Sequence, residues 1–161
     1  MSDFRIVRDY PDPIGKVWRA ATDPDLVPRW TATGRGGRPV GFEPTVGARF
    51  RFVAEPVPGW RGFVDCEVLE IDAPRLLRYT WVGEENGRPT YVTYRLEPRG
   101  TGTRFTFEHT GFRGVGGLIM SKLLGSVRRK MLDVGLPRLL NDLDDDGNLR
   151  SSARTHRNDS G

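Results

Sequence analysis

The fold is decided by RLLRYTW at residues 75–81 and by TYVTYRLEPRGTGTRFTFEHTGF at residues 90–112. Together they contain three runs in which apolar and polar side chains alternate, as in strands with one buried face. The positions that share the inner face are Leu77, Tyr79, Trp81, Val92, Tyr94, Leu96, Phe105, Phe107 and His109. The turn EPRGTG at 97–102 joins the last two runs. The sequence therefore predicts an antiparallel meander with an aromatic inner face.

Further strands and two short helices are expected before the meander. Strands are predicted at residues 3–9, 48–55, 61–72, 75–82, 90–98 and 102–110, and the glycine- and proline-rich loop at 33–47 allows one more short strand. PIGKVWRAATD, with Pro13 in the first turn, has the spacing of a helix. DPDLVPRW predicts a second helix with Asp23 as its N-cap.

Residues 115–143 have the spacing of one long amphipathic helix. Its apolar positions recur at threes and fours and are Met120, Leu123, Leu124, Val127, Met131, Val134 and Leu139. The basic residues Lys122, Arg128, Arg129 and Lys130 fall largely on the other side, which predicts a solvated outer face. Gly135 and Pro137 are expected to interrupt the helix, and the acidic run from Asp142 to end it near Leu143.

Size and composition indicate one domain. The chain has 161 residues, enough for a single core, with a domain expected at 1–146 and a polar, disordered tail at 147–161. One cysteine, Cys66, excludes an internal disulfide, and two histidines exclude a structural zinc site. Cys66 is expected to be a small buried hydrophobic residue, since no neighbouring base is evident to lower its pKa.

Charge and hydropathy limit the partners. The net charge is +4, but both signs are interspersed, so no nucleic-acid surface is predicted. The N-terminus MSDFRIVRDY lacks a basic-then-apolar leader, and no stretch approaches the ~18 apolar residues of a membrane span. We therefore expect a cytoplasmic protein, without membrane association, that is a monomer or a weak dimer.

The residues that remain as candidates are those of a pocket. No GxSxG, GxxxxGK[ST], GxGxxG after a strand, or HExxH motif occurs, so no cofactor or metal is predicted. Ligand pockets are mostly apolar with a few polar groups that fix orientation. The expected lining consists of Trp30, Phe50, Phe52, Cys66, Tyr79, Trp81, Tyr94, Phe105, Phe107 and His109, with Met120, Leu124 and Met131 from the helix. Between sheet and helix we expect a cavity of a few hundred cubic ångströms.

Four segments resemble one known superfamily. They are PIGKVWRAATDPDLVPRW at 13–30, VG before RFRF at 46–52, VLEIDAPRLLRYTW at 68–81 and GTGTRFTFEHTGF at 100–112. In this order the chain resembles the START-like helix-grip (SRPBCC) superfamily, most closely the branch named after the activator of heat-shock-protein ATPase. The resemblance implies an α+β helix-grip fold. In that fold a curved antiparallel sheet of about six to seven strands wraps around a long C-terminal helix, with two short helices after the first strand.

The fold permits several functions. The favoured hypothesis is a non-enzymatic binder of an apolar, aromatic or polyketide-like small molecule. In a second, the protein is a cyclase or aromatase in which His109, Tyr79 and Tyr94 move protons. A third is a chaperone-interacting module, as the family name suggests. The superfamily that the chain resembles also includes self-resistance proteins of enediyne producers, which are cleaved at a glycine. Here the candidate positions are Gly111, Gly114, Gly116 and Gly117.

Overall fold

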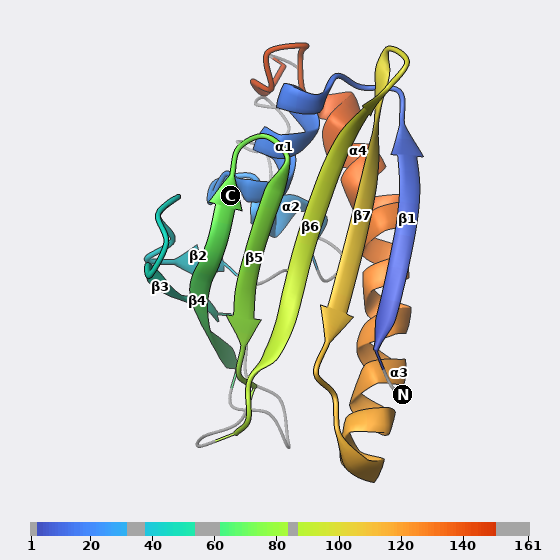
Figure 1. Cartoon of the computed structure of the whole chain (residues 1–161). Coiled ribbons are helices and arrows are strands. Elements are labelled where there is room, and N and C mark those ends of the chain that lie inside the picture. Colours follow the sequence, from blue (N-terminus) through green and yellow to red (C-terminus); the bar gives the residue numbers. More distant parts are fainter. Residues whose placement is uncertain (1–2, 32–37, 54–61, 84–86, 151–161) are drawn as a thin grey trace.

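The computed structural model describes residues 3–31, 38–53, 62–83 and 87–150. Within these ranges seven strands form one sheet, ordered β1-β7-β6-β5-β4-β3-β2, and each neighbouring pair is antiparallel (Figure 1). The strands are β1 (Phe4–Tyr10), β2 (Arg38–Val40), β3 (Arg49–Val53), β4 (Phe63–Asp72), β5 (Leu76–Trp81), β6 (Thr90–Arg99) and β7 (Gly102–Thr110). The predicted meander is β5-β6-β7, and its inner positions have the predicted register.

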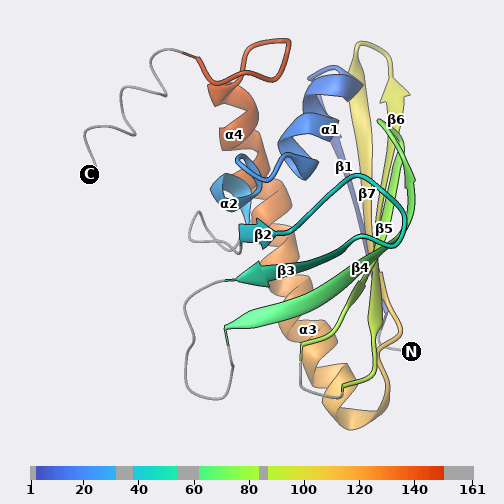
Figure 2. The ribbon, with the colours of Figure 1, turned by 90° about the vertical axis from the view of Figure 1, so that its left-hand side faces the viewer.

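The helices lie on one side of the sheet, and β2, β3 and part of β4 curve round toward them (Figure 2). They are α1 (Ile14–Thr22), α2 (Val27–Trp30), α3 (Gly114–Lys130) and α4 (Leu136–Asp142), with a π-helical turn η2 (Met131–Gly135) between the last two. This is the α+β helix-grip fold that the sequence predicts. No helix in the described ranges is long and apolar enough to cross a membrane.

The second helix begins later than the sequence predicts. The Asp23 carboxylate accepts a hydrogen bond from the Asp25 N–H at 2.9 Å, and the Asp23 N–H itself caps α1 by donating to the Arg19 carbonyl. Asp23 therefore holds a turn between the helices instead of capping α2. The helical residues of α2 start at Val27, after one further turn.

The predicted interruption of the long helix is the π-helical turn η2. Pro137 has no N–H to donate to the carbonyl four residues earlier, so a regular α-helical ladder cannot continue through it. At Gly135 a Cβ would overlap the carbonyl oxygen of Trp30. The absence of a side chain at Gly135 thus lets α2 and η2 approach closely, and this contact holds Trp30 over the sheet.

The first four residues of the expected tail are packed. Leu149 forms a β-bridge with Leu143 and lies partly buried against the core. The Arg150 N–H donates to the Asp142 carbonyl at 2.9 Å. Residues 151–161, the rest of the expected tail, lie outside the described residues.

Candidate functional site

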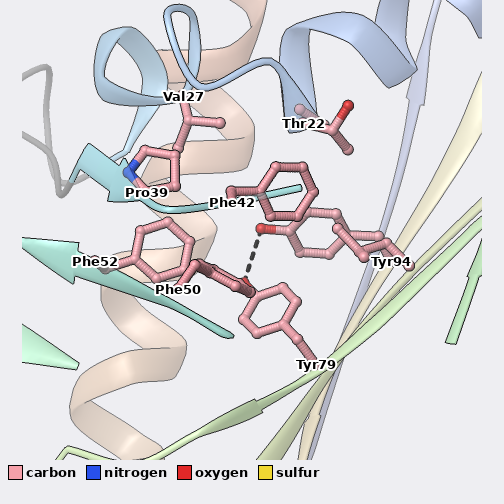
Figure 3. A pocket seen from close by; sticks show the side chains of 10 residues that line it. Thr22, Val27, Pro39, Phe42, Phe50, Phe52, Tyr79 and Tyr94 are labelled. Carbon is pink, nitrogen blue, oxygen red and sulfur yellow. Dashed lines mark hydrogen bonds between the residues drawn. The ribbon is translucent and has the colours of Figure 1, made fainter. Parts of the chain in front are cut away.

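A small hollow lies between the short helices and the curved end of the sheet (Figure 3). The residues around it are Ala21, Thr22, Val27, Pro39, Phe42, Phe50, Phe52, Leu77, Tyr79 and Tyr94. Its free volume is about 10 Å³, about the room that one water molecule needs. No residue of the helix predicted at 115–143 lines this hollow, so it is not the cavity of a few hundred cubic ångströms that the sequence predicts between the sheet and that helix.

Half of the residues around this hollow carry aromatic rings. The ring of Phe50 packs edge-on against Phe42 at 5.1 Å and against Tyr79 at 5.4 Å between centroids. The hydroxyls of Tyr79 and Tyr94 are hydrogen-bonded to each other at 3.0 Å, as Figure 3 shows. Burial raises the pKa of both phenols, so both stay neutral at ordinary pH. The wall therefore offers apolar ring surface and one pair of mutually bonded hydroxyls.

Arg128 is buried, which the sequence did not predict. Only 7% of the residue is exposed, and its guanidinium lies 4.5 Å from the centroid of the Trp81 ring and 5.2 Å from that of Phe107. Its Nη1 donates to the sulfur of Met131 at 3.7 Å. The remaining donors, Nε and Nη2, are buried without a hydrogen-bond partner in the protein. A positively charged group therefore lies inside the fold instead of on the solvated outer face.

The helix turns Arg128 inward because α3 docks through small residues. Ser121 and Gly125 are buried, and a Cβ at Gly125 would lie 3.8 Å from the ring of Phe4 on β1. Because positions 121, 125 and 128 share one helical face, close packing of the first two brings Arg128 to the interior.

The docking of α3 also corrects part of the predicted lining. Met120 is 46% exposed and does not face the interior, Leu124 is half-buried, and Met131 is buried as expected. Leu123 and Val127, also predicted to be on the core side, are exposed at 59% and 43%. The apolar stripe read from the sequence thus lies beside the buried face of α3 and not on it.

His109 points inward, in the predicted register on β7. Its Nε2 lies 2.7 Å from the hydroxyl oxygen of Thr90, and that hydroxyl donates to the Trp81 carbonyl at 3.1 Å. All three groups are satisfied when the imidazole carries its proton on Nε2. Nδ1 is then a lone-pair acceptor, buried and without a partner in the protein. Burial, and secondarily the charge of Arg128, lower the pKa of His109 to about 3, so the ring is neutral at ordinary pH.

Cys66 and Trp30, two further residues of the predicted lining, are both buried. The thiol of Cys66 is buried on β4, and burial raises its pKa well above the usual value, so it is no nucleophile at neutral pH. Trp30 is fully buried at the end of α2, with its ring 6.5 Å from that of Tyr94, and its indole Nε1 has no hydrogen-bond partner in the protein.

The predicted lining falls into two adjoining groups. Phe50, Phe52, Tyr79 and Tyr94 line the hollow, with Trp30 against Tyr94. Trp81, Phe107, His109 and Met131 belong to the group around Arg128. Phe105 packs on Tyr10 and Tyr94 in the core. Residues of the site that the sequence did not single out are Ala21, Thr22, Val27, Pro39, Phe42, Leu77, Thr90 and Arg128. Helical periodicity gave no signal for Arg128, because it assigned that position to the outer face.

The candidate glycines mark the start of α3. Gly111 and Gly114 have φ of 93° and 68°, a backbone region that favours glycine, and so turn the chain from β7 into the helix. Gly116 and Gly117 lie inside α3 and not in a loop. The segment borders the site, because Phe112 packs on His109 with ring centroids 4.5 Å apart.

The titratable side chains of this interior are neutral at ordinary pH, apart from Arg128. Its phenols and imidazole are neutral, its thiol is inert, and its one cation has no carboxylate beside it among the described residues. Those residues also contain no group of three potential metal ligands. A general acid–base catalyst works best with a pKa near the working pH, which His109 does not have.

One family profile matches most of the fold. The family described as Activator of Hsp90 ATPase homolog 1-like protein matches residues 12–123. A comparison with curated proteins finds no significant match.

Solved structures with the same architecture come from several bacteria. MLL2253 from Mesorhizobium loti is 29% identical with a TM-score of 0.72, over 88% of this chain and 98% of that protein. CalU16 from Micromonospora echinospora is 25% identical with a TM-score of 0.63, over 83% and 75%. DynU16, a protein of the dynemicin biosynthetic locus, is 23% identical with a TM-score of 0.63 over 84% of this chain. The match spans 48% of DynU16, and at this identity it shows the fold alone.

Proposed function

The chain belongs to the family of Activator of Hsp90 ATPase homolog 1-like proteins, and from this premise we propose that it binds an apolar, aromatic or polyketide-like small molecule between the sheet and α3. The observation that carries the proposal is an aromatic interior with unused polar atoms. Trp30 Nε1, His109 Nδ1 and two nitrogens of Arg128 are buried without partners in the protein. Since native interiors satisfy nearly all buried polar groups, these atoms indicate a binding surface.

Entry requires that side chains move, because the hollow holds only about one water molecule. The exposed apolar stripe on α3, formed by Met120, Leu123 and Val127, runs beside the buried Arg128. On the other flank, α3 is tied to β1 through Gly125 against Phe4. We infer that a ligand enters along the exposed stripe and displaces rings of the wall, so that part of α3 becomes covered on binding.

Binding is tested with N-phenyl-1-naphthylamine, a neutral probe whose fluorescence rises in apolar surroundings. We expect a saturable increase with one site per chain. His109→Gln preserves hydrogen-bonding capacity and is expected to change the binding free energy by no more than ~1 to 2 kcal/mol, the scale of one hydrogen bond. The absence of any saturable signal would contradict the proposal.

The cyclase hypothesis is separated from passive binding by the same variant. In a cyclase that uses His109, His109→Gln would lower turnover of a polyketide-like substrate by ~10²-fold or more and leave binding nearly intact. We expect no product from the wild type, because an imidazole with a pKa of about 3 is uncharged at ordinary pH, so it lacks the acidic proton of an imidazolium and is a weak base. Product formed by the wild type and lost in the variant would overturn passive binding.

A self-resistance role is a second candidate, favoured by the position of the glycine segment. Gly111 precedes Phe112 in the chain and Gly117 packs against it, and Phe112 in turn packs on His109, so a diradical held in the interior would have glycine Cα–H bonds close by. Incubation with an activated enediyne and intact-mass analysis tests this role. Specific cleavage between residues 111 and 117 would support it, whereas an intact chain or scattered cleavage would contradict it.

A further inference from the structure

We propose that the ligand carries an anionic oxygen group, such as a carboxylate, and that Arg128 is the residue that binds it. The inference rests on the proposed binding function and extends it, since an apolar ligand alone would need no buried cation. Arg128 is buried, its two nitrogens without partners lie on one edge of the guanidinium, and aromatic rings surround it.

A buried guanidinium without a carboxylate partner is costly to the folded state. Arginine stays protonated at any ordinary pH, so it cannot escape the penalty by losing its charge. Arg128 is 7% exposed, and no ion pair joins it to an acidic side chain of the described residues. The two rings and the Met131 sulfur that it contacts are weak partners for a full charge. Within the described ranges, therefore, no acidic side chain neutralises this cation.

The free nitrogens of Arg128 are the two that bind a carboxylate side-on. A guanidinium presents Nε–H and one N–H of Nη2 in parallel along a single edge, and these two groups can donate to both oxygens of one carboxylate. These are the atoms without partners, while Nη1 is occupied by the Met131 sulfur. The two nitrogens without partners therefore lie on one edge and can bind a carboxylate together.

Aromatic side chains of the protein surround the guanidinium of Arg128. The guanidinium carbon lies over the Trp81 ring and near the Phe107 ring, and the centroids of the Trp81 and His109 rings are 5.7 Å apart. An aromatic acid can place its ring among these side chains and its oxygens on the edge of Arg128. The Tyr79 and Tyr94 hydroxyls are bonded to each other, so the hydrogen of only one of them is left to donate.

Two dyes with one scaffold test the proposal. N-phenyl-1-naphthylamine is neutral, and 8-anilinonaphthalene-1-sulfonate adds one anionic oxygen group to the same rings. The quantity measured is the ratio of their dissociation constants, neutral over anionic, in the wild type, Arg128→Met, Arg128→Lys and Arg129→Met. Arg129 is the matched control, because it is exposed on the same helix and its loss changes the net charge equally.

We expect the ratio to fall at least tenfold in Arg128→Met and to stay within twofold in Arg129→Met. Arg128→Lys keeps the charge without the fork and should fall between the wild type and Arg128→Met. An equal fall in Arg129→Met, or none in Arg128→Met, would overturn the anion site while leaving the proposed function in place. Failure of the neutral dye to bind the wild type would overturn the proposed function, and this inference with it.

The melting temperature of the ligand-free protein is an independent test of the anion site. If Arg128 is kept for an anion, Arg128→Met should melt at the same temperature as the wild type or higher, because it removes an uncompensated buried charge and retains an apolar stem. A clear loss of stability would show that Arg128 has a structural counter-ion, and it would overturn the proposal.

Discussion

Lowering the pH from 6.5 to 4 is expected to remove about 3 kcal/mol of folding stability through His109 alone. The folded protein holds this imidazole neutral with a pKa of about 3, whereas the unfolded chain binds a proton near pH 6.5. Between these values the unfolded state binds more protons, so stability is complete above pH 6.5 and is lost as the pH falls toward 3. Urea unfolding at half-unit intervals measures the slope.

The variant His109→Gln should flatten this slope between pH 6.5 and 4. The window ends at pH 4 because three carboxylates begin to affect stability below it. Hydrogen bonds from Arg104, Arg8 and the Asn148 N–H lower the pKa values of Asp9, Asp133 and Asp144, respectively, and the stability that these hydrogen bonds contribute is lost at lower pH. A slope in His109→Gln equal to that of the wild type would show that His109 is not a buried neutral group.

Gly135→Ala is expected to destabilise the protein by about 3 kcal/mol, at the upper end of overpacking effects. The new Cβ would overlap the carbonyl oxygen of Trp30, which is backbone and cannot move as a flexible side chain does. Either η2 must shift away from α2 or Trp30 must leave its position over the sheet. Thermal or urea unfolding measures the loss, and near-ultraviolet circular dichroism reports the movement of the indole.

Gly116→Ala is the matched control. Gly116 is an exposed helical position with no atom within 4 Å of a Cβ, so alanine should stabilise α3 by ~0.5 to 1 kcal/mol. The two substitutions make the same chemical change and should have opposite signs. Equal stability of Gly135→Ala and Gly116→Ala would contradict the tight contact between η2 and α2.

The strands could be predicted because their burial has a simple period. Phe105, Phe107 and His109 alternate with polar residues on β7, and a strand with one buried face has no other register that keeps these rings inside. Gly135 and Pro137 likewise indicated a break, because the backbone chemistry of these residues is local.

The centre of the site could not be predicted, because it depends on how α3 docks. Periodicity assigns the buried face to the most apolar stripe, which includes Met120 and Val127. The helix instead packs through Ser121 and Gly125, and Gly125 lies opposite the ring of Phe4 on β1. That rotation brings Arg128 inside, and nothing in the charge pattern of the segment marks it. Pro39 on β2 and Phe42 just after it were missed for a similar reason, since tertiary packing alone brings this segment to the hollow.

The most direct test of binding between sheet and helix is the indole N–H region of a ¹⁵N–¹H correlation spectrum. N-phenyl-1-naphthylamine is added to labelled protein, and the indole signals are assigned by single Trp→Phe variants. Trp30 and Trp81 belong to the candidate site, whereas Trp18 lies on α1 outside it and serves as the internal control. We predict saturable shifts of the Trp30 and Trp81 signals, with the Trp18 signal unchanged. Binding of the probe with no shift of Trp30 or Trp81 would contradict the proposed site.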